Sequence, residues 1–223
     1  MSTTTSSPVT LAVVSAGMSD ASSTRLLADR LAEAAHDALG GTPARIERVD
    51  LRPLAHPIAD HLLTGFPGPE LRAALDTVTG ADALIAATPT FKASYSGLFK
   101  SFFDLFDEGT LENLPVLAAA TGGSARHSLM LDTAMRPLFA HLRAMVLPVG
   151  VYAASEDWAG AGEALEARIR RAGAQLARTV GLLRGGSIPA GDGRGEAPVL
   201  RHGRRDEFAD VPDFADLLAR AAR

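Results

Sequence analysis

Short apolar runs alternate along the chain with longer segments in which apolar residues recur every three or four positions. The short runs predict β-strands, because a continuous apolar stretch of this length is typical of a strand buried on both faces of a parallel sheet. The periodic segments predict helices that bury one face. The expected strands are 9–15, 44–51, 83–88, 115–121 and 147–153, and the expected helices are 22–39, one from Pro69, 98–106, 129–145 and 160–183.

The strict alternation of five strand–helix units predicts an α/β fold with a doubly wound parallel sheet. Five strands without a sixth favour the flavodoxin-like order 2-1-3-4-5. The proline-rich segment 51–68 is expected to be a loop. We expect one domain over residues 1–184, followed over 185–223 by a flexible connector rich in glycine and proline and a short amphipathic helix.

The loop after the first expected strand has the chemistry of an anion site. It carries five hydroxyl side chains and a glycine just before a helix begins, and the free N–H groups of a helix N-terminus favour an anion. The hydroxyls predicted to donate to a phosphate monoester are those of Ser15, Ser22, Ser23 and Thr24. In the alternative interpretation, Ser22 or Ser23 only caps the helix.

The segment after the third expected strand carries six residues at fixed spacings. They are Pro89, Phe91, Ser94, Gly97, Lys100 and Asp104. This pattern resembles the motif of NADPH-dependent FMN reductases, and the stretch is most similar to the reductase subunits of two-component flavin monooxygenase systems. Phe91 stands where that family more often has tyrosine. The resemblance covers about residues 9–183.

The segment Thr121–Ser124, after the fourth expected strand, contains two consecutive glycines. Glycines let a backbone approach a flat ring closely, and their N–H groups can donate to its polar edge. In the resembling family, the Thr-Gly-Gly segment contacts the isoalloxazine ring. The alternative is an ordinary glycine turn, and the nearby His127 either touches a ligand or caps the next helix.

The resemblance implies an NAD(P)H:FMN oxidoreductase that transfers hydride from NADPH or NADH to FMN. The phosphate of FMN would lie in the 15–24 loop and its ring between the 89–97 and 121–124 loops. Tyr95, where the family has a π-type bulge, is predicted to position the nicotinamide by stacking. Lys92 and Arg126 are either partners of an NADPH 2′-phosphate or surface charges. The residues expected to contact FMN are Ser15, Gly17, Ser22, Ser23, Thr24, Pro89, Thr90, Phe91, Lys92, Ser94, Tyr95, Thr121, Gly122, Gly123 and Ser124.

The same resemblance implies that reduced FMN passes to a separate luciferase-like monooxygenase. It also implies a homodimer or homotetramer with its sites near subunit contacts. Two other functions stay open: a quinone or azo-dye reductase that keeps FMN tightly bound, and a flavodoxin-type electron carrier without NAD(P)H oxidation. The serine-rich rather than acidic loops disfavour the carrier.

Composition excludes several other functions. The 223 residues contain no cysteine, which excludes disulfides, thiolate metal sites and a thiol nucleophile. The net charge of −4 argues against nucleic-acid binding. We expect no metal site, because His56 and His61 are five residues apart and do not share a helix face. The N-terminus lacks the basic region of a secretory signal, so we expect a cytoplasmic protein without membrane attachment.

Overall fold

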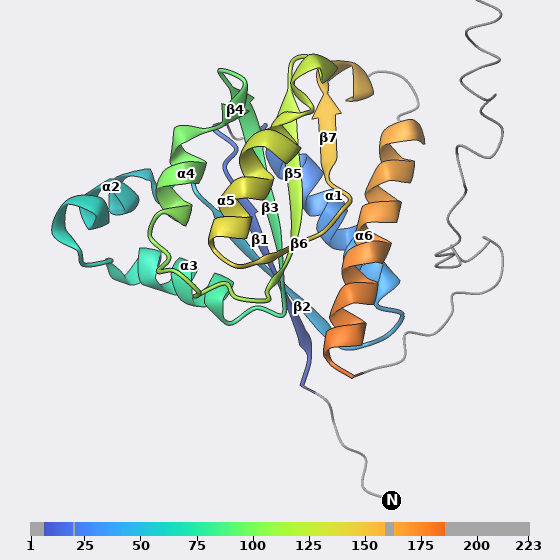
Figure 1. Ribbon diagram of the computed structural model, residues 1–223, viewed down its shortest axis with the longest axis horizontal. Helices are drawn as coiled ribbons and strands as arrows, with labels where there is room; N and C mark the ends of the chain where they lie inside the picture. Colours follow the sequence, from blue (N-terminus) through green and yellow to red (C-terminus); the bar gives the residue numbers. More distant parts are fainter. Residues whose placement is uncertain (1–6, 20, 159–162, 186–223) are drawn as a thin grey trace, which may run out of the picture. The chain divides into compact units, whose positions relative to one another are not determined.

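The computed structural model describes residues 7–19, 21–158 and 163–185, which form one sheet with helices on both faces (Figure 1). The strands are β1 (Val9–Ser15), β2 (Ala44–Asp50), β3 (Ala83–Phe91), β4 (Ser94–Tyr95), β5 (Pro115–Gly122), β6 (Met145–Val146) and β7 (Val151–Ala154). The α-helices are α1 (Ser23–Ala38), α2 (Ala55–Thr64), α3 (Pro69–Thr79), α4 (Gly97–Phe103), α5 (Arg136–His141) and α6 (Glu163–Leu183). The 3₁₀-helices η1 (Ala125–His127) and η3 (Ser155–Trp158) and the π-helix η2 (Leu131–Met135) complete the list.

The sheet has the predicted order. β2, β1, β3 and β5 lie side by side and all pair in parallel. β5 then pairs in parallel with β6 at its start and with β7 at its end. When β6 and β7 are counted as one interrupted fifth strand, the order is 2-1-3-4-5, which confirms the flavodoxin-like fold class.

The fifth strand is divided, where the sequence predicted one continuous strand over 147–153. Leu147 still donates a backbone hydrogen bond to Val116. Pro148 has no N–H to give to a ladder. A Cβ at Gly150 would lie 3.1 Å from the carbonyl oxygen of Ala118, so the chain passes close to β5 there without a regular strand.

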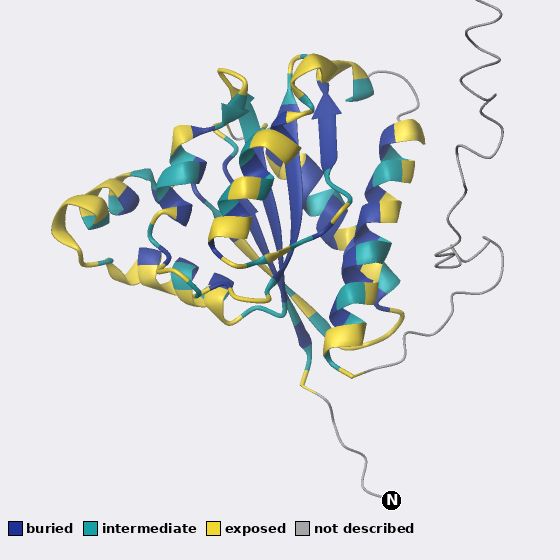
Figure 2. Cartoon of the chain, in the orientation of Figure 1, coloured by how far each residue is buried: buried dark blue, intermediate teal, exposed yellow. Residues whose placement is uncertain are grey.

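Two apolar cores lie on opposite faces of the sheet. One contains buried side chains of α1 and α6, and the other contains those of α2, α3, α4 and α5. The middle strands are buried along almost their whole length (Figure 2). α6 buries one stripe that includes Leu165, Ile169, Leu176 and Val180, whereas Leu183 at its end is exposed. It approaches α1 closely at Gly173, where a Cβ would lie 2.7 Å from the backbone of Ala34 and Ala35.

The segment 51–68 contains a helix, so the prediction of a loop was wrong. α2 buries Ile58, and Leu54 at its N-cap is also buried. Pro57 lies in the first turn, where a missing N–H costs no helical hydrogen bond. Gly65, with φ of 77°, ends the helix in the left-handed conformation. The prolines of this segment made it resemble a loop. The helix forms because Pro57 lies in its first turn, the one place where proline is compatible with a helix.

The predicted helix 129–145 is also different. A π-helix, η2, precedes the short α5, and the helix ends at His141 before β6 begins. In an α-helix, the N–H of residue 137 would donate to the carbonyl oxygen of Thr133. Pro137 has no N–H, and the wider π-turn lies where this hydrogen bond is missing. The π-type bulge expected around Tyr95 is absent, because Tyr95 lies in the extended strand β4.

The predicted connector and C-terminal helix lie outside the described residues, apart from Gly185 at the start of the connector. Among the helices that the structure describes, none combines the length and apolar character needed to cross a bilayer.

Candidate functional site

Three loops meet at the carboxyl end of the sheet. Since β1 pairs with β3 and β3 pairs with β5, the segments that follow these strands are brought to one edge. They border a cavity of about 550 Å³, within the range of small-molecule sites. The predicted site residues that line this cavity are Ser22, Ser23, Thr24, Pro89, Thr90, Phe91, Thr121, Gly122 and Gly123.

The other predicted residues lie elsewhere. Ser15 and Gly17 line a neighbouring cavity of about 420 Å³, which shares Ser19 and Ser22 with the first. Ser94 and Tyr95 line a groove of about 640 Å³ beside α4, η2 and α5. The structure therefore separates Tyr95 from the three-loop cavity, and the stacking role predicted for it stays a prediction. Lys92 and Ser124 line none of these cavities.

The first loop folds back on itself at Gly17. A Cβ at this position would lie 2.1 Å from the hydroxyl oxygen of Ser22, so a larger residue would displace that side chain. Ser22 is the N-cap of α1, and its Oγ accepts a hydrogen bond from the Arg25 N–H at 3.3 Å. The capping role therefore holds for Ser22. Ser23 is exposed at the start of α1 and lines the cavity.

A buried hydroxyl pair ties the first loop to the third. Thr24 Oγ1 lies 2.6 Å from Thr121 Oγ1, and both residues are buried. Because this hydrogen bond is buried, the Thr24 side chain positions the first turn of α1 against the end of β5. Thr24 also lines the cavity, and its predicted part as a phosphate donor stays a prediction.

The second loop is a tight hairpin between β3 and β4. Thr90 pairs with Tyr95 and Phe91 with Ser94, so the turn contains only Lys92 and Ala93. Both turn residues have positive φ, 50° and 65°. At the base of the hairpin, the buried Thr88 hydroxyl accepts the Ser96 N–H at 3.0 Å. Phe91 is 48% exposed beside the cavity, which leaves its ring available to a ligand.

Tyr152 of β7 connects the second and third loops, and sequence reasoning missed it. Its buried phenol donates to the carbonyl oxygen of Ser124 at 3.1 Å and accepts from Thr90 Oγ1 at 3.3 Å. A Cβ at Gly122 would lie 2.0 Å from the phenol oxygen, so this glycine makes room for Tyr152. A Cβ at Gly123 would meet nothing within 4 Å. The sequence could have pointed to Tyr152, because it is the one tyrosine in an otherwise apolar strand and a buried tyrosine needs a hydrogen-bond partner.

Trp158, at the end of η3, is a second lining residue that the sequence did not suggest. Arg30 of α1 lies over its ring, 5.5 Å from the centroid. The η3 turn is held by Arg168, which pairs with Asp157 and donates to the Tyr152 carbonyl oxygen at 2.7 Å. The sequence could have pointed to Trp158, because the one tryptophan of the chain lies shortly after the fifth expected strand.

The charged residues named from the sequence lie outside the cavity. Lys100 of α4 and Asp104, the C-cap of that helix, form an i,i+4 ion pair. Lys92, Arg126 and His127 are exposed and line none of the three hollows. Within residues 7–19, 21–158 and 163–185, no group of three or more His, Asp or Glu side chains is placed to hold a metal ion.

The donor set fits a flat aromatic molecule with an anionic tail. Ser22, Ser23 and the N-terminus of α1 supply hydroxyl and amide donors on one side of the cavity. The open space at Gly123 allows a ring to approach the backbone, and Phe91 and Trp158 add aromatic surface. The arrangement can therefore orient a mononucleotide-like ligand, and it requires no nucleophile or metal.

Comparisons with known proteins agree with this geometry. The model of the family described as NADPH-dependent FMN reductase matches residues 9–159. An FMN reductase (NADPH) of Pseudomonas aeruginosa is 39% identical over 178 residues, covering 78% of this chain and 94% of that protein. NADH-dependent FMN reductase SfnF of Pseudomonas fluorescens is 42% identical over 145 residues, covering 64% of this chain and 78% of that protein.

A solved structure is similar over the same region. It is an oxidoreductase from Corynebacterium diphtheriae, 43% identical in sequence, with a TM-score of 0.76. The match covers 78% of this chain and 98% of that one.

Proposed function

The chain belongs to the NADPH-dependent FMN reductase family, and on this premise we propose that it transfers hydride from NADPH or NADH to FMN bound where its three loops meet. The observation that carries the proposal is the convergence of the hydroxyl-rich loop, the β3–β4 hairpin and the Gly122–Gly123 backbone on one cavity. Each of these loops carries residues that the family resemblance assigns to the flavin.

The residues that would hold FMN divide by chemistry. Ser22, Ser23 and the first amides of α1 would donate to the phosphate. The backbone at Gly122 and Gly123 would face the polar edge of the ring, and Phe91 would lie against the ring. When bound, FMN supplies the hydride acceptor, so that NAD(P)H, one proton and FMN give NAD(P)⁺ and FMNH₂.

The protein would contribute to the reaction by aligning the nicotinamide with the flavin. A hydride donor and acceptor react when they are held about 3–3.5 Å apart, and fixing that distance supplies much of the rate enhancement. Tyr152 stiffens the site because it joins the hairpin to the glycine loop through two hydrogen bonds. Backbone N–H groups near Gly123 would donate hydrogen bonds to a bound flavin ring and would stabilise negative charge on it.

The product of this reaction would leave the protein. The cavity is open, and Phe91 beside it is half exposed, which favours exchange of flavin over tight retention. We propose that reduced FMN is delivered to a separate flavin-dependent monooxygenase, as the resemblance to two-component reductases implies. The supply of NAD(P)H to such a reaction favours a cytoplasmic location.

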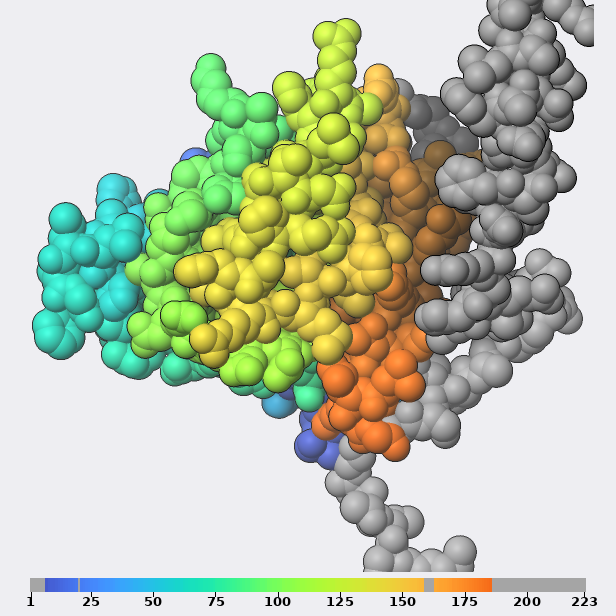
Figure 3. Space-filling model, viewed as in Figure 1, coloured from blue at the N-terminus to red at the C-terminus, as the bar shows by residue number. Residues whose placement is uncertain are grey.

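A homodimer or homotetramer is part of the proposal. The groove beside α4, η2 and α5 is lined by the partly buried side chains of Tyr95 and Leu138, and burial of their remaining apolar surface would stabilise an association. α4 and α5 lie next to each other on the face shown in Figure 3, in green and yellow. Size-exclusion chromatography with light scattering is expected to give a multiple of the 23.2 kDa chain mass, and a monomer would contradict this part.

Oxidation of NADPH and NADH by flavin-stripped protein tests the function. We expect saturable oxidation that depends on added FMN at micromolar concentration. Turnover that needs a quinone but no added flavin would instead identify a quinone reductase. Binding of FMN without oxidation of either nicotinamide cofactor would identify an electron carrier, and either result overturns the proposal.

A further inference from the structure

One side of the three-loop cavity is formed by residues that have no part in the proposed flavin contacts. Ser155 and Trp158, at the two ends of η3, line the cavity together with the three loops. η3 follows β7 directly, and β7 and β3 pair with opposite edges of β5 (Figure 1). In the order of the sheet, the Gly122–Gly123 segment therefore lies between Trp158 and the hairpin of Phe91.

The indole of Trp158 is held in place from two helices. Arg168 of α6 pairs with Asp157 and so fixes the η3 turn. Arg30 of α1 lies over the indole ring, 5.5 Å from its centroid, and is itself paired with Glu166 of α6. A ring that is already fixed loses little conformational freedom when a ligand stacks on it.

Part of this indole is available to a ligand. Trp158 is partly buried against the apolar core that includes side chains of α1 and α6, and it also lines the cavity. Among the described residues that line the cavity, Phe91 and Trp158 are the aromatic ones. Since Phe91 is assigned to the flavin ring, Trp158 offers a place for a second flat ring.

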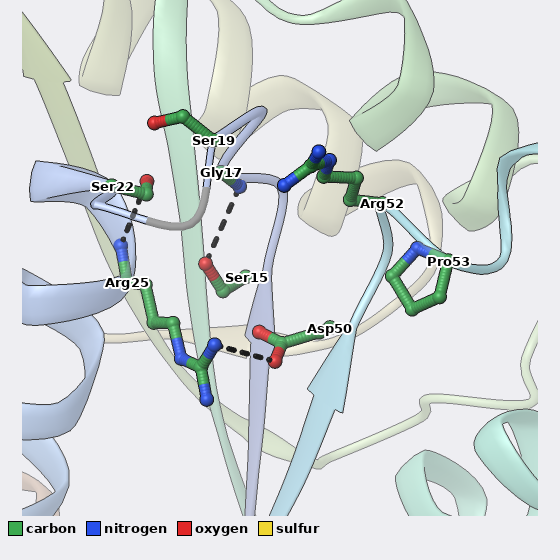
Figure 4. A pocket seen from close by; sticks show the side chains of 8 residues that line it. All are labelled: Ser15, Gly17, Ser19, Ser22, Arg25, Asp50, Arg52 and Pro53. Atoms are coloured by element: carbon green, nitrogen blue, oxygen red, sulfur yellow. Dashed lines mark hydrogen bonds and ion pairs between the residues drawn. The ribbon is translucent and has the colours of Figure 1, made fainter.

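The neighbouring cavity at the ends of β1 and β2 has a different lining. It includes the first loop and the ion pair of Arg25 and Asp50, at 3.5 Å (Figure 4). None of the described residues that line it is aromatic. Covering charged groups with a flat ring removes them from water at a cost in free energy. A second ring is therefore expected at Trp158 and not in this cavity.

The proposed reaction brings such a ring to the site. NADPH and NADH each join a nicotinamide nucleotide through a pyrophosphate to adenosine. The nicotinamide must lie against the flavin for hydride transfer, so adenine is the flat ring of the cofactor that remains to be bound. Stacking of a base on an aromatic side chain contributes roughly five- to 150-fold to affinity.

We propose that Trp158 binds the adenine of NADPH or NADH by stacking, and that Arg30 positions the indole for this contact. The inference rests on the proposed reductase function, because the adenine belongs to the hydride donor of that reaction. The contact is remote from the reacting atoms. It therefore contributes to the affinity for the cofactor and not to the hydride transfer itself.

A hydride donor without adenosine tests the inference. Reduced nicotinamide mononucleotide transfers the same hydride as NADH but carries no adenine. In Trp158→Ala we expect kcat/KM for NADH to fall about tenfold through a higher KM, and kcat/KM for the mononucleotide to stay unchanged. Trp158→Phe retains a ring and is expected to recover most of the loss. Equal falls for the two donors, or no fall for NADH, would overturn the inference.

The part of Arg30 is tested by removing its charge. Arg30→Met keeps an apolar side chain of similar length, and we expect it to raise the KM for NADH about threefold without changing kcat or the KM for the mononucleotide. The matched control is Arg48→Met, which breaks a similarly exposed ion pair with Asp29 and is expected to change neither KM. An effect of Arg30→Met no larger than that of Arg48→Met would refute the positioning role.

Fluorescence gives a readout that is independent of turnover. Trp158 is the one tryptophan of the chain, so tryptophan emission reports on this ring alone. In the flavin-stripped full chain, ADP-ribose, which is the adenine half of the cofactor, is expected to change the emission saturably. Ribose 5-phosphate, which has no base, is expected to leave it unchanged. An emission change with both compounds, or with neither, would contradict adenine stacking.

Two further results separate this inference from the proposed function. If the protein oxidises neither NADPH nor NADH with FMN, the proposed function fails, whereas a saturable response to ADP-ribose that Arg30→Met weakens still supports adenine binding at Trp158. If NADH is oxidised, and Trp158→Ala weakens FMN binding and lowers kcat/KM equally for both donors, Trp158 contacts the flavin. In that case the proposed function stands and this inference is wrong.

Discussion

At the scale of single residues, Gly122 and Tyr152 act as one unit beneath the site. The phenol occupies the space that a side chain at 122 would need, and it holds both neighbouring loops through hydrogen bonds. The Thr-Gly-Gly segment predicted a close approach to a ligand. The structure adds a different reason for the first glycine, which depends on a residue 30 positions away and is invisible in the local sequence.

A double-mutant cycle measures this coupling. Gly122→Ala forces Tyr152 to move and is expected to cost about 1–3 kcal/mol of unfolding free energy, as overpacking does. Tyr152→Phe removes two hydrogen bonds and is expected to cost about 1 kcal/mol. Because phenylalanine lacks the oxygen that clashes, we expect the double variant to lose less than the sum of the two.

Chemical denaturation provides the measurement for this cycle. Gly97→Ala is the control, because a Cβ there meets nothing within 4 Å and the position lies in a helix. It is expected to leave stability unchanged or slightly raised. Additive losses in the Gly122 and Tyr152 variants would show that the two residues do not interact.

At the scale of secondary-structure elements, the buried threonine pair fixes α1 against β5. Thr24→Val or Thr121→Val alone leaves one buried hydroxyl without its partner and is expected to cost about 1–3 kcal/mol. The double variant replaces both polar groups and is expected to cost less than the sum.

The control for the threonine pair is Thr77→Val on the exposed side of α3, where a change within about 0.5 kcal/mol is expected. Unfolding free energies from urea titration provide the comparison. If Thr24→Val lowers the unfolding free energy no more than Thr77→Val does, the Thr24–Thr121 pair does not hold α1 against β5.

The β3–β4 hairpin stores backbone strain in its two-residue turn. Tight hairpin turns of this kind favour Asn-Gly, whereas this chain places Lys92 and Ala93 there at positive φ. Ala93→Gly is expected to raise the unfolding free energy by about 1 kcal/mol, because glycine adopts this conformation without steric cost.

The opposite result is expected where the same change is made in a regular helix. Ala73→Gly in α3 should lower stability by about 1 kcal/mol, because glycine is a poor helix former. Thermal unfolding of Ala93→Gly and Ala73→Gly distinguishes the relief of backbone strain in the hairpin turn from a general effect of glycine on stability. A loss of stability in Ala93→Gly would contradict a strained turn.

Elements with a long apolar period were predictable, and interrupted ones were not. The stripe of α6 and the buried strands β3 and β5 follow directly from periodicity and continuous apolar sequence. α2 was missed because Pro57 resembles a helix breaker until its place in the first turn is known. The π-helix η2 was missed because one continuous helix was predicted over 129–145. That prediction took no account of the hydrogen bond that Pro137 cannot form.

At the scale of the whole molecule, the order of the sheet decides which loops can form a site. Alternation of strands and helices predicted that order, and the order placed the loops after β1, β3 and β5 together. The side chains that line the cavity were less predictable. Tyr95 belongs to the right segment, but strand pairing turns it toward α4 and η2, and Trp158 reaches the cavity from a turn that has no sequence motif.

Calorimetric titration of the flavin-stripped full chain with FMN and with riboflavin tests the central claim most directly. The account predicts one FMN bound per chain, and riboflavin bound at least about tenfold more weakly, because it lacks the phosphate that the first loop would hold. Absence of FMN binding, or equal affinity for the two flavins, would contradict it.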